Sequence, residues 1–234
     1  MIYAQTHPRM HATLSELVQP GDARASSLLL SADGRFLLGI RPPVHERGRV
    51  LLRLTGIGGW AEGDESFAAT VVRESVEETG SSVRLLDLDE TLLVHSPDDI
   101  QTTGFSRDTS PAAVVYRRFG TAPFDPWSAS YGSVAPVAVF VGVLDRPARI
   151  QRPEELPLFM WVHVEQMIAL ADSDEPLDYL LEDGAELVGP VGFDHAQAIV
   201  RLTDSIQALL TALGPRAFVF LCDIARLTQP TRAE

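Results

Sequence analysis

Residues 59–81 read GWAEGDESFAATVVRESVEETGS and place four carboxylates, Glu65, Glu74, Glu77 and Glu78, around one predicted helix. Like charges at positions i and i+4, such as Glu74 and Glu78, destabilise an isolated helix by roughly 0.2–0.5 kcal/mol. The cost disappears when a cation lies among the carboxylates, and oxygen-only ligands suit hard divalent ions such as Mg²⁺, Mn²⁺ or Ca²⁺. The stretch therefore indicates a cation site on a helix.

The position of the carboxylates around this helix favours a site over an open surface. Asp64 is the predicted N-cap and Gly80 the predicted end of the helix. A core-facing stripe is predicted from the helical spacing of Phe67, Val71, Val72 and Val76. Stepping around the helix puts Glu74 and Glu78 at the edge of this stripe, whereas Glu77 turns further toward solvent.

A glycine-rich loop, with glycines at 56, 58 and 59, comes immediately before the helix. Its backbone N–H groups, together with those at the helix start, can bind an anion. A divalent ion can lower the pKa of a water molecule and polarise a phosphoryl oxygen. Loop and carboxylates together predict metal-assisted hydrolysis of a phosphate anhydride. The alternative is a solvated helix face with incidental charge pairs.

The same stretch resembles the box of the Nudix family, G-x₅-E-x₇-R-E-U-x-E-E-x-G-U, where U is a bulky aliphatic residue. All seven fixed positions agree, and they are Gly59, Glu65, Arg73-Glu74, Glu77-Glu78 and Gly80. Both U positions depart from the pattern, since they hold Ser75 and Ser81. Ser75 falls within the apolar stripe, so we expect its hydroxyl to bond to the carbonyl of Val71. We interpret the departure as a loss of packing, not of chemistry.

The resemblance implies roles for the residues of the box. Glu74, Glu77 and Glu78 would hold the metal, Mg²⁺ or Mn²⁺, with Glu77 as a further or water-mediated ligand. Glu77 and Glu78 would thereby be catalytic. Arg73 would orient the glutamates by pairing with Glu65.

Two further roles follow from the resemblance outside the helix. The backbone of Gly58 and Gly59 would hold metal or phosphate. Nudix enzymes often take their general base from a loop before a late strand, and Glu154 and Glu155 lie in such a place. Glu155 is the candidate base, and ordinary loop charge is the alternative for both residues.

The resemblance covers roughly residues 24–170 and implies an α+β fold, an α/β/α sandwich with a mixed sheet. The residues themselves predict a hairpin joined by Asp33-Gly34. The predicted strands are 26–30, 35–40, 48–54, 83–94, 134–144 and 158–164, with 134–144 central and buried on both faces.

The domain organisation is predicted as an N-terminal arm, 1–22, and a single Nudix domain, 23–234. The arm is expected to carry a short helix over 12–18. The domain includes a long insert at 96–133 and a C-terminal helix at 194–213. Aromatic and arginine side chains in the insert would stack on a base and meet a phosphate, or would pack the insert, or form a contact of a homodimer.

Composition excludes several classes of function. The net charge of −13 over 234 residues disfavours a nucleic acid polymer as partner. Cys222 is the only cysteine and lies in an apolar run, where we expect a buried thiol in a reducing compartment. The first residues lack the apolar segment of a signal peptide, and no apolar run appears long enough to span a membrane. We expect a soluble cytoplasmic protein.

The resulting hypothesis is a Nudix hydrolase, a divalent-metal-dependent pyrophosphohydrolase. Its substrate would be a small nucleoside diphosphate derivative, ADP-ribose-like, or a nucleoside triphosphate. The alternative is a non-catalytic nucleotide-binding sensor of the Nudix fold that signals through its C-terminal helix. A purely structural domain is a third reading. The sequence does not name the substrate.

Overall fold

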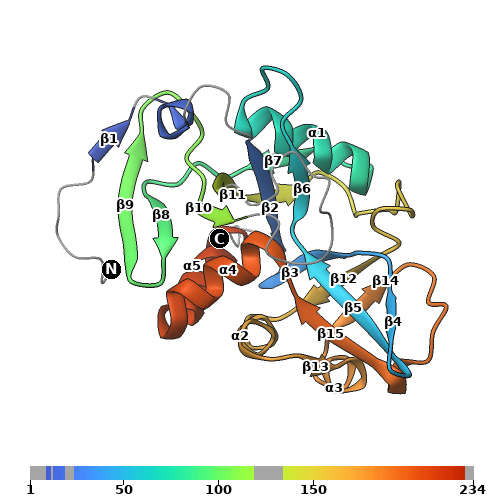
Figure 1. The fold of residues 1–234 in the computed structure, drawn as a ribbon. Helices are drawn as coiled ribbons and strands as arrows, with labels where there is room; N and C mark the ends of the chain where they lie inside the picture. The colour runs from blue at the N-terminus through green and yellow to red at the C-terminus, as the bar shows by residue number, and fades with distance from the viewer. Residues whose placement is uncertain (1–8, 12, 19–23, 119–133, 230–234) are drawn as a thin grey trace, which may run out of the picture.

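The structure is a computed structural model that describes residues 9–11, 13–18, 24–118 and 134–229 (Figure 1). In this part of the chain the strands join one mixed sheet along the path β1-β9-β8-β10-β11-β2-β3-β5-β15-β13. The strands are β1 Arg9–His11, β2 Ala25–Ala32, β3 Arg35–Ile40, β4 Val44–Glu46, β5 Arg49–Thr55, β6 Ile57–Trp60, β7 Val83–Leu85, β8 Thr91–Ser96, β9 Asp99–Phe105, β10 Ala113–Arg118, β11 Val134–Leu144, β12 Leu158–Val162, β13 Glu175–Pro176, β14 Glu186–Val188 and β15 Ala198–Leu202.

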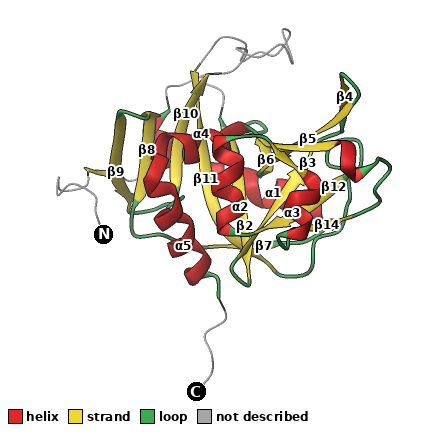
Figure 2. Ribbon diagram, turned by 90° about the horizontal axis from the view of Figure 1, so that it is seen from below, coloured by secondary structure: helices red, strands yellow, loops and turns green. Residues whose placement is uncertain are grey.

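Helices cover both faces of this sheet. They are η1 Leu14–Leu17, α1 Phe67–Thr79, α2 Val164–Asp172, α3 Leu177–Glu182, η2 His195–Gln197, α4 Asp204–Leu213, η3 Gly214–Arg216 and α5 Ala217–Leu227. The view from below shows α4 lying over β10 and β11 (Figure 2). The predicted α+β class with a mixed sheet and helices on both sides is confirmed.

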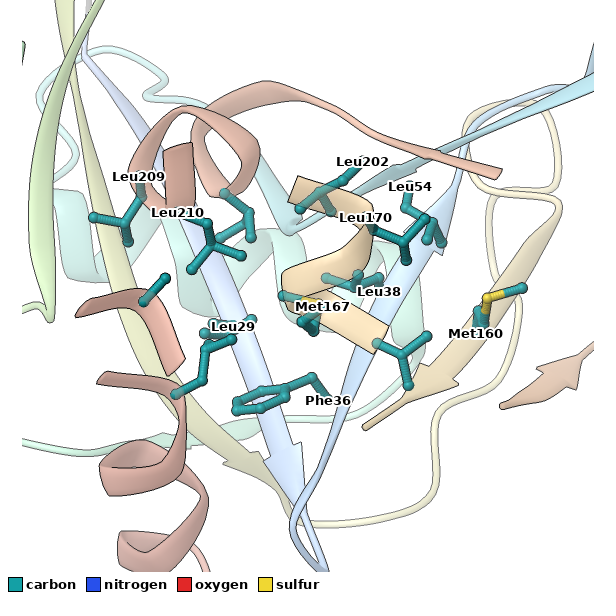
Figure 3. Close-up of a cluster of buried hydrophobic side chains, with 14 of the residues drawn as sticks. Leu29, Phe36, Leu38, Leu54, Met160, Met167, Leu170, Leu202, Leu209 and Leu210 are labelled. Atoms are coloured by element: carbon teal, nitrogen blue, oxygen red, sulfur yellow. The ribbon is translucent and has the colours of Figure 1, made fainter. Parts of the chain in front are cut away.

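An apolar core lies on each face of the sheet, between the sheet and its helices. There are two cores because successive side chains of a strand point to opposite faces. On β2, Leu28 and Leu30 face the core under α1, where Phe67 and Val71 pack. Leu29 faces the opposite core, which α2, α4 and α5 cover. Figure 3 shows Leu29 and Phe36 in this second core, with Met167 of α2 and Leu209 of α4.

The hairpin between β2 and β3 is confirmed. Their antiparallel pairing runs from Leu30↔Leu37 to Ala32↔Arg35. Asp33 and Gly34 both have positive φ, 53° and 78°. Two positive φ values are what the tight turn favoured by right-twisted strands requires, and Asp-Gly supplies them at low cost.

The central strand is also confirmed, and its neighbours explain its composition. β11 pairs with β10 on one side and with β2 on the other. Residues 135–141 are all buried. A strand covered on both faces needs apolar side chains at successive positions, so the run is continuous.

Two predictions between the box and this strand are wrong. The segment 83–94 is not one strand but two, β7 and β8, which pair with different partners. The segment 96–133, predicted as a long insert that connects two strands, itself contains the strands β9 and β10. β9 lies next to β1 at the end of the sheet path and is largely polar, so its sequence lacked the apolar pattern of a strand. Residues 119–133 lie outside the described part of the chain.

The predicted N-terminal arm is joined to the domain where the structure describes it. β1 pairs with β9, and Leu14 of η1 is buried. The predicted helix over 12–18 is a single 3₁₀ turn, η1.

The predicted helix at 194–213 is wrong in its first half. Residues 198–202 form β15, which pairs in parallel with β5, and helix α4 begins only at Asp204. Val200 and Leu202 have apolar side chains that suit a strand as well as a helix, and burial beside β5 decides in favour of the strand.

The C-terminal helices α4, η3 and α5 form a continuous run, Asp204–Leu227, that is long and apolar enough by length and composition to cross a membrane. The sequence expectation of no such run is therefore not met. Core helices meet the same criterion, and Leu209, Leu213 and Leu221 of this run are buried in the core of the domain. Cys222 of α5 is only half-buried, contrary to the expected buried thiol.

Candidate metal and catalytic site

Helix α1 begins two residues later than predicted. Ser66, not Asp64, is the N-cap, and its hydroxyl accepts a hydrogen bond of 3.1 Å from the N–H of Ala69. Gly80 ends the helix in the left-handed conformation, with φ 68°, as predicted. A glycine suits this position because other residues pay a steric cost there.

The buried face of α1 differs from the predicted stripe. Phe67 and Val71 are buried, but Val72 and Val76 are 37% and 46% exposed. The rest of the buried face is polar and consists of Thr70, Glu74, Ser75, Glu78 and Thr79. The helix is thus rotated so that Glu74 and Glu78 point inward instead of lying at the border.

Strand β6 makes room for these carboxylates. The predicted glycine loop is a strand that pairs with β2, matching Gly58 with Ser27 and Gly59 with Ser26. A Cβ atom added to Gly59 would lie 2.3 Å from Glu74 Oε1, and one added to Gly58 would lie 2.2 Å from the carbonyl oxygen of Ser26. Glycine is required at both positions because β6 passes closely between β2 and α1.

Glu78 is the most deeply buried carboxylate of the box. It is 5% exposed, and its Oε2 accepts a hydrogen bond of 3.1 Å from the N–H of Gly58. Burial, reinforced by the nearby charge of Glu74, raises the pKa of Glu78 to about 8, against the opposing effects of Gly58 and Arg41. Burial also raises the pKa of Glu74, against the opposing effect of Arg73. Two neighbouring carboxylates are thus held where their charges are costly.

Arg73 connects three of the glutamates. Its Nε donates to Glu65 Oε1 at 2.9 Å, as predicted. Its Nη1 donates to Glu74 at 2.9 Å and to Glu77 at 3.2 Å. The hydrogen bond from Arg73 is the main cause that lowers the pKa of Glu65 to about 2. Arg73 therefore fixes Glu65 and Glu74 relative to each other.

Glu77 also pairs with a second arginine, Arg152, that the sequence left unassigned. Arg152 Nη2 lies 2.6 Å from Glu77 Oε2, and Arg152 Nη1 donates to Glu155 Oε1 at 3.1 Å. The signal in the sequence was the position of Arg152, in the same loop as the candidate base Glu155.

The loop that carries Glu155 lies against the end of α1. The N–H of Gln151 donates to the carbonyl oxygen of Glu78 at 3.3 Å, and that of Arg149 donates to Thr79 at 2.8 Å. The charge of Glu155 is close enough to contribute to the raised pKa of Glu78. The structure thus brings the candidate base Glu155 to the box, although its side chain is exposed like that of Glu154.

The two serines at the aliphatic positions of the box have structural partners. Ser75 Oγ donates to the carbonyl oxygen of Ser81 at 3.0 Å, so the predicted bond to Val71 is wrong. Ser81 Oγ accepts from the N–H of Arg146 at 3.0 Å. These bonds tie the end of α1 to the segment that follows it and to the chain after β11.

The donor set fits a hard cation with few protein ligands. Within the described residues, no group of three or more His, Cys, Asp or Glu side chains is arranged to hold a metal. Mg²⁺ usually takes one or two carboxylates and fills its other positions with water and phosphate oxygens. Glu74 and Glu78 meet that requirement, whereas Glu77 is engaged by arginines.

No family model and no curated protein matches the sequence. Solved structures do match, and many of them are Nudix hydrolases. A MutT Nudix hydrolase from Burkholderia pseudomallei shares 21% identity, with 61% of this chain and 84% of that one covered at a TM-score of 0.36. An Ap4A hydrolase from C. elegans shares 16% identity, with 64% and 87% covered at a TM-score of 0.40.

A third match is an ADP-ribose pyrophosphatase from Streptococcus suis, at 13% identity, with 62% of this chain and 75% of that one covered and a TM-score of 0.37. Nudix hydrolases thus recur among the solved structures that match this chain.

Proposed function

We propose that this protein is a Nudix hydrolase that uses Mg²⁺ or Mn²⁺ to cleave a phosphate anhydride in a small nucleoside diphosphate derivative. The observation that carries the proposal is the environment of Glu78. Its carboxylate is buried beside Glu74, accepts one hydrogen bond, and forms no ion pair with any described residue. A buried carboxylate without a counter-charge costs free energy, and a divalent cation between Glu74 and Glu78 would offset this cost.

In this proposal, Glu74 and Glu78 hold the ion. When bound, the ion would polarise a phosphoryl oxygen and lower the pKa of a water molecule. Arg73 keeps Glu74 in place through its hydrogen bond, and Gly58 does the same for Glu78. Gly58 therefore orients the proposed metal ligand Glu78 through its backbone N–H. Gly59 leaves the space that the Glu74 carboxylate fills.

Glu155 is proposed as the general base that accepts a proton from the attacking water. Its hydrogen bond with Arg152 places its carboxylate beside the Glu77 end of the box. Glu77 would contact the ion through water or act through Arg152, because its carboxylate is already paired with two guanidinium groups. A general base contributes typically about 10²–10⁴-fold to a rate.

The test is a substrate screen with product identification. The protein is incubated with Mg²⁺ or Mn²⁺ and a panel that includes ADP-ribose, dinucleoside polyphosphates and nucleoside triphosphates. We expect release of a nucleoside monophosphate or of inorganic (pyro)phosphate, and loss of that release in EDTA. Absence of turnover on every member of the panel would contradict the proposal.

A nucleotide sensor without catalysis is the second candidate. The ion pairs of Glu77 with Arg73 and Arg152 favour it, because they occupy a carboxylate that a hydrolase could use. Nucleotide binding without turnover in the same screen would support it. A cytoplasmic location and a homodimer stay predictions from the sequence.

A further inference from the structure

A second charged cluster lies at the start of α4, formed by side chains from four different elements or their ends. Asp204 is its centre. Its Oδ1 accepts a hydrogen bond of 2.7 Å from Arg117 Nη1, on β10. Its Oδ2 accepts one of 2.9 Å from the hydroxyl of Thr55, at the end of β5, and lies 3.7 Å from Nε of Arg41, just after β3.

The backbone of Asp204 is strained. Its φ of 66° lies in the left-handed region, which costs free energy for residues with a side chain, although less for aspartate than for bulkier ones. Thr203 holds the strained residue in place, because its N–H and its hydroxyl both bond the carbonyl oxygen of Leu54 at 2.8 Å. Strain of this kind persists only where the surroundings enforce it, and such positions cluster at ligand sites.

Two guanidinium groups, those of Arg117 and Arg41, share the carboxylate of Asp204 in a chain whose net charge is −13. Although burial opposes it, the charges of Arg117 and Arg41 hold the pKa of Asp204 below its ordinary value, so the carboxylate is ionised at neutral pH. The Arg41 side chain is 45% exposed, and its contact with Asp204, at 3.7 Å, is longer than a hydrogen bond. Arg41 therefore presents N–H groups that an anion could accept.

This positive cluster lies next to the buried carboxylates. Thr55, which bonds Asp204, and Gly58, which bonds Glu78, are three residues apart in the chain. Three residues of extended chain span at most about 10 Å. In addition, the charge of Arg41 acts on the carboxyl of Glu78. One small ligand could thus contact a cation at Glu78 and the guanidinium of Arg41.

We propose that Arg41 and Arg117, positioned by Asp204, form an anion subsite for the nucleotide substrate. The subsite would bind a phosphate group other than the one held at the Glu74–Glu78 pair. This inference rests on the proposed function for the identity of the ligand. Guanidinium groups bind phosphate through paired N–H donors, and a carboxylate that holds two of them fixes their orientation. Asp204 is a positioning residue, since it acts on the ligand only through the two arginines.

The test measures binding without metal and without turnover, so its failure is distinct from a failure of hydrolysis. Inorganic pyrophosphate, ADP and adenosine are titrated calorimetrically in EDTA into the wild type and Arg41→Gln. Arg201→Gln is the matched control. Arg201 is an exposed arginine on β15, and its Nη2 lies 2.6 Å from Oδ2 of Asp174. Thermal unfolding of each variant verifies that it is folded.

We expect Arg41→Gln to bind pyrophosphate and ADP about tenfold more weakly than the wild type, as loss of charge-assisted hydrogen bonds implies. Arg201→Gln should bind like the wild type, and adenosine should not distinguish the proteins. Three results would overturn the subsite: no binding of pyrophosphate to the wild type, equal affinity in Arg41→Gln, or an equal loss in Arg201→Gln. Dependence on Arg41 for pyrophosphate but not for ADP would overturn the assignment to the nucleotide.

The variant Asp204→Asn tests whether Asp204 positions the two arginines or only compensates their charge. If Asp204 positions the arginines, the variant should bind pyrophosphate several-fold more weakly even though the cluster has gained positive charge. Stronger binding in Asp204→Asn would show that the aspartate only offsets charge, and would contradict the positioning role.

Discussion

The two faces of α1 depart from the usual distribution of side chains, although Phe67 and Val71 are buried as expected. The inward face holds Glu74 and Glu78, which are 8% and 5% exposed, while Val72 and Val76 lie on the outward face. Hydrophobic burial alone would place the valines inside. The helix instead packs its carboxylates against the glycines of β6, where burial makes their charge costly. The proposed cation would be the partner of this inner face.

The largest expected effect comes from removing the most buried charge of the inner face. Glu78→Gln keeps the shape of the side chain but removes the ligand charge. We expect turnover of the substrate found in the screen to fall by about 10³-fold or more, since a metal ligand and the electrostatic stabilisation that it supports are lost together. Steady-state kinetics measures the effect.

The control is Glu182→Gln, which neutralises an exposed glutamate on α3. It should turn over substrate like the wild type. Near-wild-type activity of Glu78→Gln would refute the ligand assignment.

A smaller effect is expected when the space for the inner face is reduced. In Gly59→Ala the new Cβ would lie 2.3 Å from Glu74 Oε1, so the carboxylate must move. A displacement of about 1 Å in a catalytic group can cost about 10²-fold in rate, and we expect a loss of this order. The comparison protein is Gly192→Ala, whose added Cβ meets no atom within 4 Å. Equal activity of the two variants would show that close packing of β6 on Glu74 is not needed.

The smallest effects should distinguish the valines of the two faces. Val71 is fully buried, so Val71→Ala should lower the free energy of unfolding by about 2 kcal/mol. Val76→Ala removes the same atoms from the exposed face and should change it by about 0.5 kcal/mol or less. Urea unfolding of both variants gives the two values. A similar loss in both would mean that the outward face is covered in solution.

The sequence revealed the chemistry of α1 better than its orientation. The box residues could be found because their spacing is specific, and the contact between Arg73 and Glu65 followed from it. The stripe was wrong because periodicity ranks faces by hydrophobicity and favours Val72 and Val76. Periodicity does not take into account that the glycines at 58 and 59 leave room for carboxylates on the opposite side of the helix.

Outside the box, the predictions failed where tertiary partners decide the local structure. β9 is polar and becomes a strand because β8 and β1 pair with it. β15 resembles the start of a helix and becomes a strand because it lies beside β5. Arg41 and Asp204 come from separate parts of the chain, and no spacing in the sequence relates them to the box. Arg152 could be found only through its place in the loop of Glu155.

The most direct test of the central claim is a calorimetric titration of Mn²⁺ into the metal-free wild type and into Glu78→Gln, with thermal unfolding followed in parallel. If the inner face of α1 is built to hold a divalent cation, Mn²⁺ should bind the wild type and raise its unfolding temperature by mass action. Glu78→Gln should bind at least about tenfold more weakly, because a buried ligand charge is lost. Equal affinity of the two proteins, or no binding to the wild type, would contradict the account.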